Sequence, residues 1–498
     1  MASDRLVYKT ALSLVTIATS GLVRLVFSLL IGHVFDAQML GHANVIVSAA
    51  VFGTLLCSPG LGQSVARQMA TRGLSVTDPA GRFLLVRATV VHHSFLVVVA
   101  AGVGFLAPTD VGAEQVLAIL LTIAYGCYTY YKAVLYGVDL VRRYAVLELT
   151  WDSLFLVSLV IILVLGARSW VLAPMVVVYG GFSIGAHRVV LSRRRTAELV
   201  TSVVGAVDVA RTTDSEATVE LRVQHHDDRP WWRAIGGYAL VTTLGTASSA
   251  GFLQLSQIFA MRAGGEHGAG LFAAALSLVT PAYLLPRAIS VVLFPAMARA
   301  AGRADSKRVR LQLKVGTDML AAALLPFFAL VGVLSTAVLT LAYGRGFSDG
   351  GVTLVIMVWA TWVSVASVPA VNALSSDPGR GYLVPAGASL VGCLLGLSVW
   401  FICGTTIEAV AWGYLVGSIV QSAVPMAEAA RRHHSPRIGF TVRVLCAAGL
   451  SLAVSLMIGR PPIGVTIVVA AALGVVVTLA VLPEFRSLAR MVRGAVAS

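Results

Sequence analysis

The sequence predicts an all-α polytopic membrane protein with about 14 transmembrane helices. Of its 498 residues, 57% are hydrophobic and only 12% are charged, which excludes a soluble globular protein. Apolar stretches of about 20 residues recur along the chain, and each could cross the roughly 30 Å hydrocarbon core as a helix. The first stretch is too long for a signal-peptide core and is followed by many others, so we expect it to remain in the mature protein.

Hydropathy predicts fourteen spans, at 11–34, 41–62, 84–106, 113–136, 145–166, 170–190, 234–259, 267–294, 315–341, 350–375, 382–403, 406–427, 440–459 and 463–482. A long polar connection divides them into two sets of six helices followed by an extra pair. The predicted organisation is an N-terminal lobe over 1–190, a cytoplasmic linker over 191–233, a C-terminal lobe over 234–430, and the extra pair with a cytoplasmic tail over 431–498.

The basic residues predict the orientation in the membrane. The net charge is +14, and the charges cluster in the loops, which points to membrane topology and not to nucleic acid. When the loops are numbered alternately, the set that includes both termini holds 31 Lys and Arg residues and the other set holds 4. Because positive loops stay inside, we expect both termini in the cytoplasm.

Two features argue against catalysis. The predicted outer loops are all short, so an integral-membrane glycosyltransferase or polymerase would have no room for its catalytic groups. The five cysteines lie in or at the ends of apolar segments without metal-ligand spacing, so we expect neither disulfides nor a metal site. The sequence therefore predicts a protein that is not an enzyme and needs no cofactor.

The first span carries Arg24 near its middle. Arginine at the centre of a span costs about 2.5–3.5 kcal/mol on insertion scales and keeps its proton. Each end of the span is about 15 Å away, which is too far for easy snorkelling. Arg24 therefore either pairs with a carboxylate or reaches an interface after all, or it lines a positively charged cavity that receives an anionic ligand inside the membrane.

Arg287 lies in the eighth span, within the proline-rich sequence PAYLLPRAISVVLFPAMAR. Prolines bend helices and free backbone carbonyls, which membranes tolerate where the helix lines a cavity or a hinge. Arg287 is nearer the cytoplasmic side, so snorkelling remains the alternative. Two arginines, one from each half, are what a diphosphate or an acidic sugar would need, because guanidinium binds such oxygens in bidentate fashion. We therefore expect Arg24 and Arg287 to bind the substrate.

Three other polar residues are candidates for ion or proton coupling. Glu148 and Asp152 stand four residues apart, on one face of the fifth span near its inner end. They form a proton or cation relay, or they are counter-ions to an arginine, the candidates being Arg142, Arg143 and Arg24. His92 in the third span titrates during transport or is a hydrogen-bonded packing residue.

The fourth span ends in a cluster of tyrosines beside a lysine, namely Tyr125, Tyr128, Tyr130, Tyr131 and Lys132. Tyrosines can stack on sugars, and they also gather at the lipid headgroups as an aromatic belt. The belt is the simpler interpretation.

The opening span with its central arginine is followed by LGHANVIVSAAVFGTLLCSPGLGQSVARQMA. Together they resemble bacterial polysaccharide-biosynthesis membrane proteins, the lipid-linked oligosaccharide flippases of the O-antigen type. These flippases belong to the multidrug/oligosaccharidyl-lipid/polysaccharide (MOP) exporter superfamily. In the second half, SVVLFPAMAR is similar to the family's proline-containing end of the eighth helix. The resemblance covers nearly the whole chain and rests on spacings of glycine, proline and small residues.

The resemblance implies two lobes in a V shape and alternating access. It implies that an undecaprenyl-diphosphate-linked glycan moves from the inner to the outer leaflet of the bacterial plasma membrane for cell-surface polysaccharide assembly. Arg24 matches the family's cationic position in the first helix and Arg287 the one in the eighth, and both positions line the cavity in such flippases. The implied partners are the lipid-linked glycan, membrane lipids and polysaccharide polymerase or assembly proteins, without nucleic acid.

Two related classes differ from this pattern. Lipid II flippases of the superfamily usually carry more arginines in the first two helices, and here the second span has none before Arg67, which favours a general glycan flippase. Multidrug extruders typically use a carboxylate in the first or seventh helix, and neither span has one. A proton- or sodium-coupled multidrug or small-molecule efflux antiporter is nevertheless the alternative, which Glu148 and Asp152 keep open.

Overall fold

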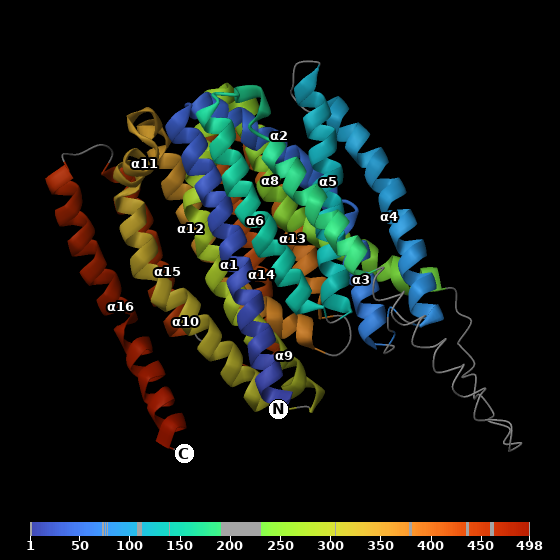
Figure 1. Cartoon of the computed structure of the whole chain (residues 1–498). Coiled ribbons are helices and arrows are strands. Elements are labelled where there is room, and N and C mark those ends of the chain that lie inside the picture. Colours follow the sequence, from blue (N-terminus) through green and yellow to red (C-terminus); the bar gives the residue numbers. More distant parts are fainter. Residues whose placement is uncertain are drawn as a thin grey trace, which may run out of the picture. The chain divides into compact units, whose positions relative to one another are not determined.

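A computed structural model describes residues 2–71, 74, 76, 78–106, 112–138, 140–190, 231–303, 305–377, 381–434, 438–458 and 463–497. Every regular element in these ranges is a helix, which confirms the predicted all-α membrane fold (Figure 1). Most of the predicted linker, 191–230, lies outside the described residues.

The described helices of the first half are α1 (Ala2–Val34), α2 (Ala37–Leu55), α3 (Ser58–Thr71), α4 (Pro79–Leu106), α5 (Ala113–Gly137), α6 (Val141–Val164), the short η1 (Arg168–Trp170) and a helix at 173–190. Those of the second half are α8 (Trp231–Val279), η2 (Thr280–Tyr283), α9 (Leu284–Gly302), α10 (Ser306–Val333), α11 (Ser335–Tyr343), η3 (Arg345–Gly350), α12 (Gly351–Ser376), α13 (Leu383–Cys403), α14 (Ile407–Arg432), α15 (Ile438–Met457) and α16 (Ile463–Ala497).

The described helices contain 13 segments that are long and apolar enough to cross a membrane. One of them, Ile235–Arg287, has 53 residues, and a straight helix of that length would extend about 80 Å. Gly265 breaks it with φ 63° and ψ −164°, a backbone conformation that favours glycine. This segment therefore holds two spans, which agrees with the predicted total of about 14.

The chain forms two compact units. Unit 1 comprises Met1–Phe52, Leu156–Val171 and Leu244–Ser498, and unit 2 comprises Gly53–Phe155 and Leu172–Thr243. Unit 1 thus joins α1 and most of α2 to the helices of the second half, whereas unit 2 holds α3, α4, α5 and the start of α6. The lobes expected along the chain, at 1–190 and 234–430, remain a prediction.

In unit 1, α12 is the central helix. Its apolar window is 78% buried, against 17–61% for the other described spans, and it packs against α9, α10 and α14. Glycines let α13 and α14 approach closely, because a β-carbon on Gly396 would lie 2.5 Å from the carbonyl oxygen of Gly413. Small residues at such contacts allow two helix backbones to pack without intervening side chains.

In unit 2, aromatic residues of α5 form much of the core. Tyr130 is fully buried, and Tyr128 and Tyr131 are buried as well. The rings of Tyr130 and Tyr131 contact each other, and the ring of Tyr128 contacts those of Tyr179 and Phe182 on the helix at 173–190. The aromatic belt expected at the headgroups is therefore wrong for these three tyrosines, because packing between helices removes their rings from the lipid.

Candidate functional site

Arg24 lies in α1, and its side chain is exposed in unit 1. One turn earlier, a β-carbon on Gly21 would lie 3.0 Å from the Leu284 side chain. Gly21 and Leu284 thus mark where α1 meets α9 and the preceding η2 turn. Because residues three apart share a helix face, Arg24 lies on the face of α1 that adjoins this contact.

Arg287 lies in the first turn of α9, three residues after Leu284, and its side chain is also exposed. The expected proline-dependent break is present, since α8 ends at Val279 and the η2 turn begins with Thr280 and Pro281 before α9 starts. The sequence around Arg287 therefore does not continue as one regular helix.

The two arginines belong to the same pair of helices. Helices α1 and α9 run in opposite directions (Figure 1). Each arginine follows its residue of the Gly21–Leu284 contact by three positions, so Arg24 and Arg287 lie about one turn from this contact toward opposite ends. One turn on each helix and an interaxial distance of 8–10 Å give a separation of about 13 Å between their Cα atoms. Two extended guanidinium groups can span such a distance around one polyanionic ligand.

Glu148 is buried in α6, and its described partners come from α5. The Oε1 atom accepts a hydrogen bond of 2.5 Å from the Tyr128 hydroxyl and lies 3.5 Å from the ammonium nitrogen of Lys132. Arg142 and Arg143 are exposed at the start of α6. The described counter-ion of Glu148 is thus Lys132, whereas the predicted counter-ions were all arginines.

The other two coupling candidates lie in different surroundings. Asp152 is half-buried one turn after Glu148 on α6. His92 on α4 is fully buried, and its Nε2 lies 2.9 Å from the Ser58 hydroxyl oxygen while its ring stacks on Tyr130 with centroids 4.3 Å apart. The structure thus places His92 in a packed core, and its part in coupling stays a prediction.

A carboxylate that the sequence reading missed lies in α10. Asp318 is fully buried and lies inside the apolar predicted span 315–341. Contacts on both sides of Asp318 show that this part of α10 packs against α12. Gly316 adjoins Pro369 of α12, and the indole nitrogen of Trp362 in α12 donates to the carbonyl oxygen of Ala321. A carboxylate in an apolar span was the signal that could have identified it.

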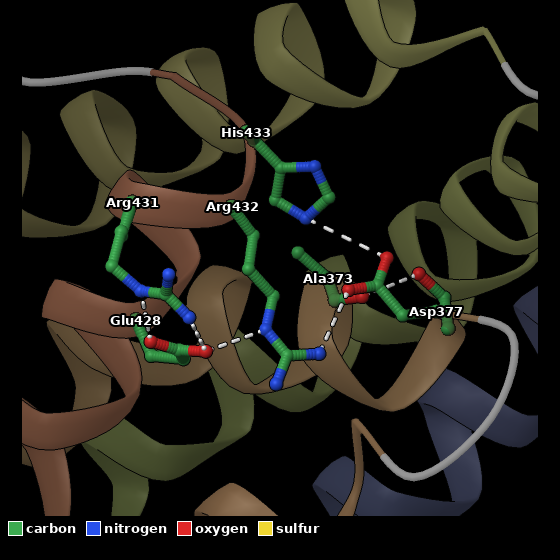
Figure 2. Close-up of polar contacts among 7 residues, drawn as sticks. Ala373, Asp377, Glu428, Arg431, Arg432 and His433 are labelled. Carbon is green, nitrogen blue, oxygen red and sulfur yellow. Dashed lines mark hydrogen bonds and ion pairs between the residues drawn. The ribbon is translucent and has the colours of Figure 1, made fainter.

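A charged cluster joins the C-terminal ends of α12 and α14 (Figure 2). Arg431 and Arg432 both bind Glu428, with nitrogen to oxygen distances of 2.8 and 2.6 Å, and Arg432 also lies 3.6 Å from Asp377. His433 Nε2 lies 3.6 Å from the other Asp377 oxygen. This cluster holds two helix ends together in unit 1. In the described part of the chain, no group of three or more His, Cys, Asp or Glu side chains is placed to hold a metal ion.

Comparison with known proteins gives one match by family. The model of the lipid II flippase MurJ matches residues 207–354, which is less than a third of the chain. No curated protein matches the sequence. The matching model is that of lipid II flippases, whereas the lack of arginines in the second span had favoured the O-antigen type.

Several solved structures share the fold. The lipid II flippase MurJ in an inward closed conformation is similar with a TM-score of 0.59 and 14% identity, over 95% of this chain and 98% of that one. A mutant of the Vibrio cholerae MATE transporter VcmN has a TM-score of 0.53 and 14% identity, over 87% and 97%. An inward-facing multidrug resistance MATE family transporter of the MOP superfamily has a TM-score of 0.52 and 15% identity, over 83% and 94%.

The MurJ and MATE structures share one arrangement of helices with this chain over nearly their whole length. The family match lies in the segment that contains α8, α9, α10 and α11. The chain is therefore a multi-pass membrane protein with the fold seen in the MurJ and MATE structures, and residues 207–354 match the model of lipid II flippases.

Proposed function

We propose that this protein is a flippase, which moves a polyprenyl-diphosphate-linked oligosaccharide from the inner to the outer leaflet of a bacterial plasma membrane by alternating access. The glycan head enters a hydrated cationic cavity, and the prenyl tail stays in lipid. The product serves cell-surface polysaccharide assembly, and both termini lie in the cytoplasm. The protein performs no catalysis on its substrate and needs no cofactor.

The observation that carries this proposal is the pair of exposed arginines on α1 and α9. Both flank the contact between Gly21 and Leu284, within unit 1. A diphosphate offers several charged oxygens over a few ångströms, so guanidinium groups from two helices can bind it in bidentate fashion. The match to lipid II flippases supports a lipid-linked glycan and makes lipid II the first substrate to test.

Transport requires that the arginines release the head group. If the site bound the ligand equally tightly when open to either side of the membrane, the conformational change would not favour release. The arginines must therefore bind the ligand more weakly when the site opens outward. A proton or counter-ion exchanged elsewhere in the protein can supply this difference. Glu148, Asp152 and His92 are the candidates for that exchange.

Native mass spectrometry of lipids that co-purify from the native host tests the proposal. We expect the wild type to retain a polyprenyl-diphosphate glycan and the double variant Arg24→Ala, Arg287→Ala to lose it. The variant Arg345→Ala removes an exposed arginine of η3 outside the α1–α9 pair and should retain the lipid. Bulk phospholipid alone, equal in wild type and double variant, would contradict the proposal.

Cation-coupled efflux of small amphiphiles is the second candidate function. It is favoured by the buried carboxylates Glu148 and Asp318 and by the fold shared with MATE transporters. Proteoliposomes with an imposed proton or sodium gradient distinguish it, because an antiporter would expel a fluorescent cation in response to the gradient. A flippase of the proposed kind would leave the fluorescent cation in place.

A further inference from the structure

An ion pair with a buried carboxylate joins α5 and α6 in unit 2. The ammonium nitrogen of Lys132 lies 3.5 Å from Glu148 Oε1, and the Glu148 side chain is only 3% exposed. The Tyr128 hydroxyl donates to the same oxygen, and it lies 3.0 Å from the ammonium nitrogen. The same carboxylate oxygen thus accepts a hydrogen bond from the Tyr128 hydroxyl and lies beside the Lys132 ammonium group.

Two aromatic rings lie beside the lysine. Its ammonium nitrogen lies 5.2 Å from the ring centroid of Tyr128 and 5.1 Å from that of Tyr144. Ring faces attract cations, and the attraction is larger where water is excluded. Lys132 is therefore held by a carboxylate and two rings, and it is the resident cation of this site.

The titratable groups that face the carboxylate come from three helices. Lys132 and Tyr128 lie on α5 and Tyr144 and Asp152 on α6, and the rings of Tyr128 and Tyr179 are 4.9 Å apart. On the helix at 173–190, His187 lies one further step away, bound through its Nδ1 to the Tyr131 hydroxyl at 2.9 Å. Among these described contacts, Lys132 is the side chain whose nitrogen forms an ion pair with Glu148.

Burial makes the state of Glu148 depend on Lys132. A carboxylate removed from water is stable as an anion only when a cation and hydrogen-bond donors compensate it. Protonation removes the anion and the need for the ammonium at once. Hard metal cations require a set of oxygen acceptors, whereas Tyr128 and Lys132, which contact Oε1, are donors, so we take a proton as the exchangeable species.

We propose that Glu148 is a proton-binding site, in which a proton and the Lys132 ammonium compete for the same carboxylate. In the step, a proton from water bonds to a Glu148 carboxylate oxygen, which becomes a carboxylic acid. Lys132 keeps its own proton and separates from Oε1, so the net charge of the pair changes from zero to +1. This inference rests on the proposed function, because it assigns to the transporter the site at which proton movement drives release of the head group.

Infrared difference spectroscopy of the full-length protein in lipid bilayers tests the site directly. The pH is stepped from alkaline to acidic, and the carbonyl stretch of protonated carboxylic acids is recorded. We expect a band that is present in the wild type and absent in Glu148→Gln. The variant Glu114→Gln removes a carboxylate from the first turn of α5, at the other end of that helix, and should retain the band.

The same measurement tests the competition. In Lys132→Met the band should already be present at a pH at which the wild type lacks it, because the cation that stabilises the carboxylate is gone. Tyr128→Phe removes one donor to the anion and should move the band in the same direction by a smaller amount. Arg143→Gln removes an exposed cation of α6 and should leave the midpoint unchanged.

Two results would overturn the inference. The band could persist in Glu148→Gln, or its midpoint could stay in place in both Lys132→Met and Tyr128→Phe. Neither result depends on a transported lipid. The proton-binding proposal can therefore be contradicted while the arginine double variant still loses the glycan, and the flippase proposal can be contradicted while Glu148 still binds a proton. Circular dichroism of each variant shows whether the helices are retained.

Discussion

Gly41 of α2 touches Gly270 of α8 backbone to backbone in unit 1. A β-carbon on Gly41 would lie 2.5 Å from the Gly270 amide nitrogen, and one on Gly270 would collide with the Ala37 carbonyl group. Beside this contact, His42 Nδ1 lies 3.1 Å from Glu266 Oε1, one residue after the break at Gly265. Two small residues and a hydrogen-bonded pair thus join the N-terminal end of α2 to the part of α8 that follows the break.

Gly270→Ala should therefore destabilise the protein. The added methyl group meets backbone atoms that cannot rotate away, and overpacking of this kind costs about 1–3 kcal/mol. Gly449→Ala in α15 is the matched control, because nothing lies within 4 Å of its β-carbon and alanine favours the helix. Thermal unfolding in detergent should show a lower midpoint for the first variant alone. Equal midpoints would mean that α2 and α8 do not pack in this way.

In the charged cluster of Figure 2, two neighbouring arginines make different contacts. Arg432 contacts both Glu428 and Asp377, whereas Arg431, whose side chain is 73% exposed, contacts Glu428 only. Exposed ion pairs contribute little because water and salt screen them, and charges that form a network contribute more. Arg432→Gln should thus lower the unfolding midpoint more than Arg431→Gln. The opposite order would show that the link to Asp377 contributes nothing.

Lys132 and Glu148 should be energetically coupled. Removal of Lys132, whose side chain is 30% exposed, leaves the buried Glu148 carboxylate uncompensated, a change that costs about 3–5 kcal/mol in a fully buried pair. We expect Lys132→Met and Glu148→Gln each to destabilise the protein, and the double variant to be more stable than the sum of the two effects. The exposed pair His42 and Glu266 supplies the comparison, with an expected coupling below about 1 kcal/mol. Additive effects at Lys132 and Glu148, measured by denaturant unfolding in micelles, would contradict a buried pair.

Much of the fold could be predicted because long apolar stretches carry their own signal. Spans, turns and the proline-dependent break before Arg287 follow from hydropathy and from residues that restrict the backbone. The break at Gly265 lies between the predicted spans 234–259 and 267–294, but its backbone conformation did not follow, because glycine tolerates both a helix and a break, and the choice depends on packing. The burial of tyrosines on α5 likewise depends on which helices surround it.

The ion pair of Lys132 and Glu148 could have been found from the sequence. Helices α5 and α6 are joined by a short connection, and the two residues stand at equal distances, eight positions, on either side of Leu140. In an antiparallel helix pair such residues lie at the same depth. The belt interpretation places Lys132 at the lipid headgroups, and the predicted counter-ions of Glu148 are therefore all arginines. For Asp318 the span was evident, but its complete burial depends on contacts with α12.

The orientation of the chain can be tested at its loops. The positive-inside rule predicts that the loop after α9 faces the cytoplasm and that η3 faces outward. In a cysteine-free background that retains transport, Arg345→Cys in η3 should react with a membrane-impermeant maleimide added to intact cells, because Arg345 is exposed. Arg303→Cys, which replaces the exposed C-cap residue of α9, should react only after the membrane is permeabilised. The reverse pattern would place both termini outside and would reverse the leaflet from which the head group enters.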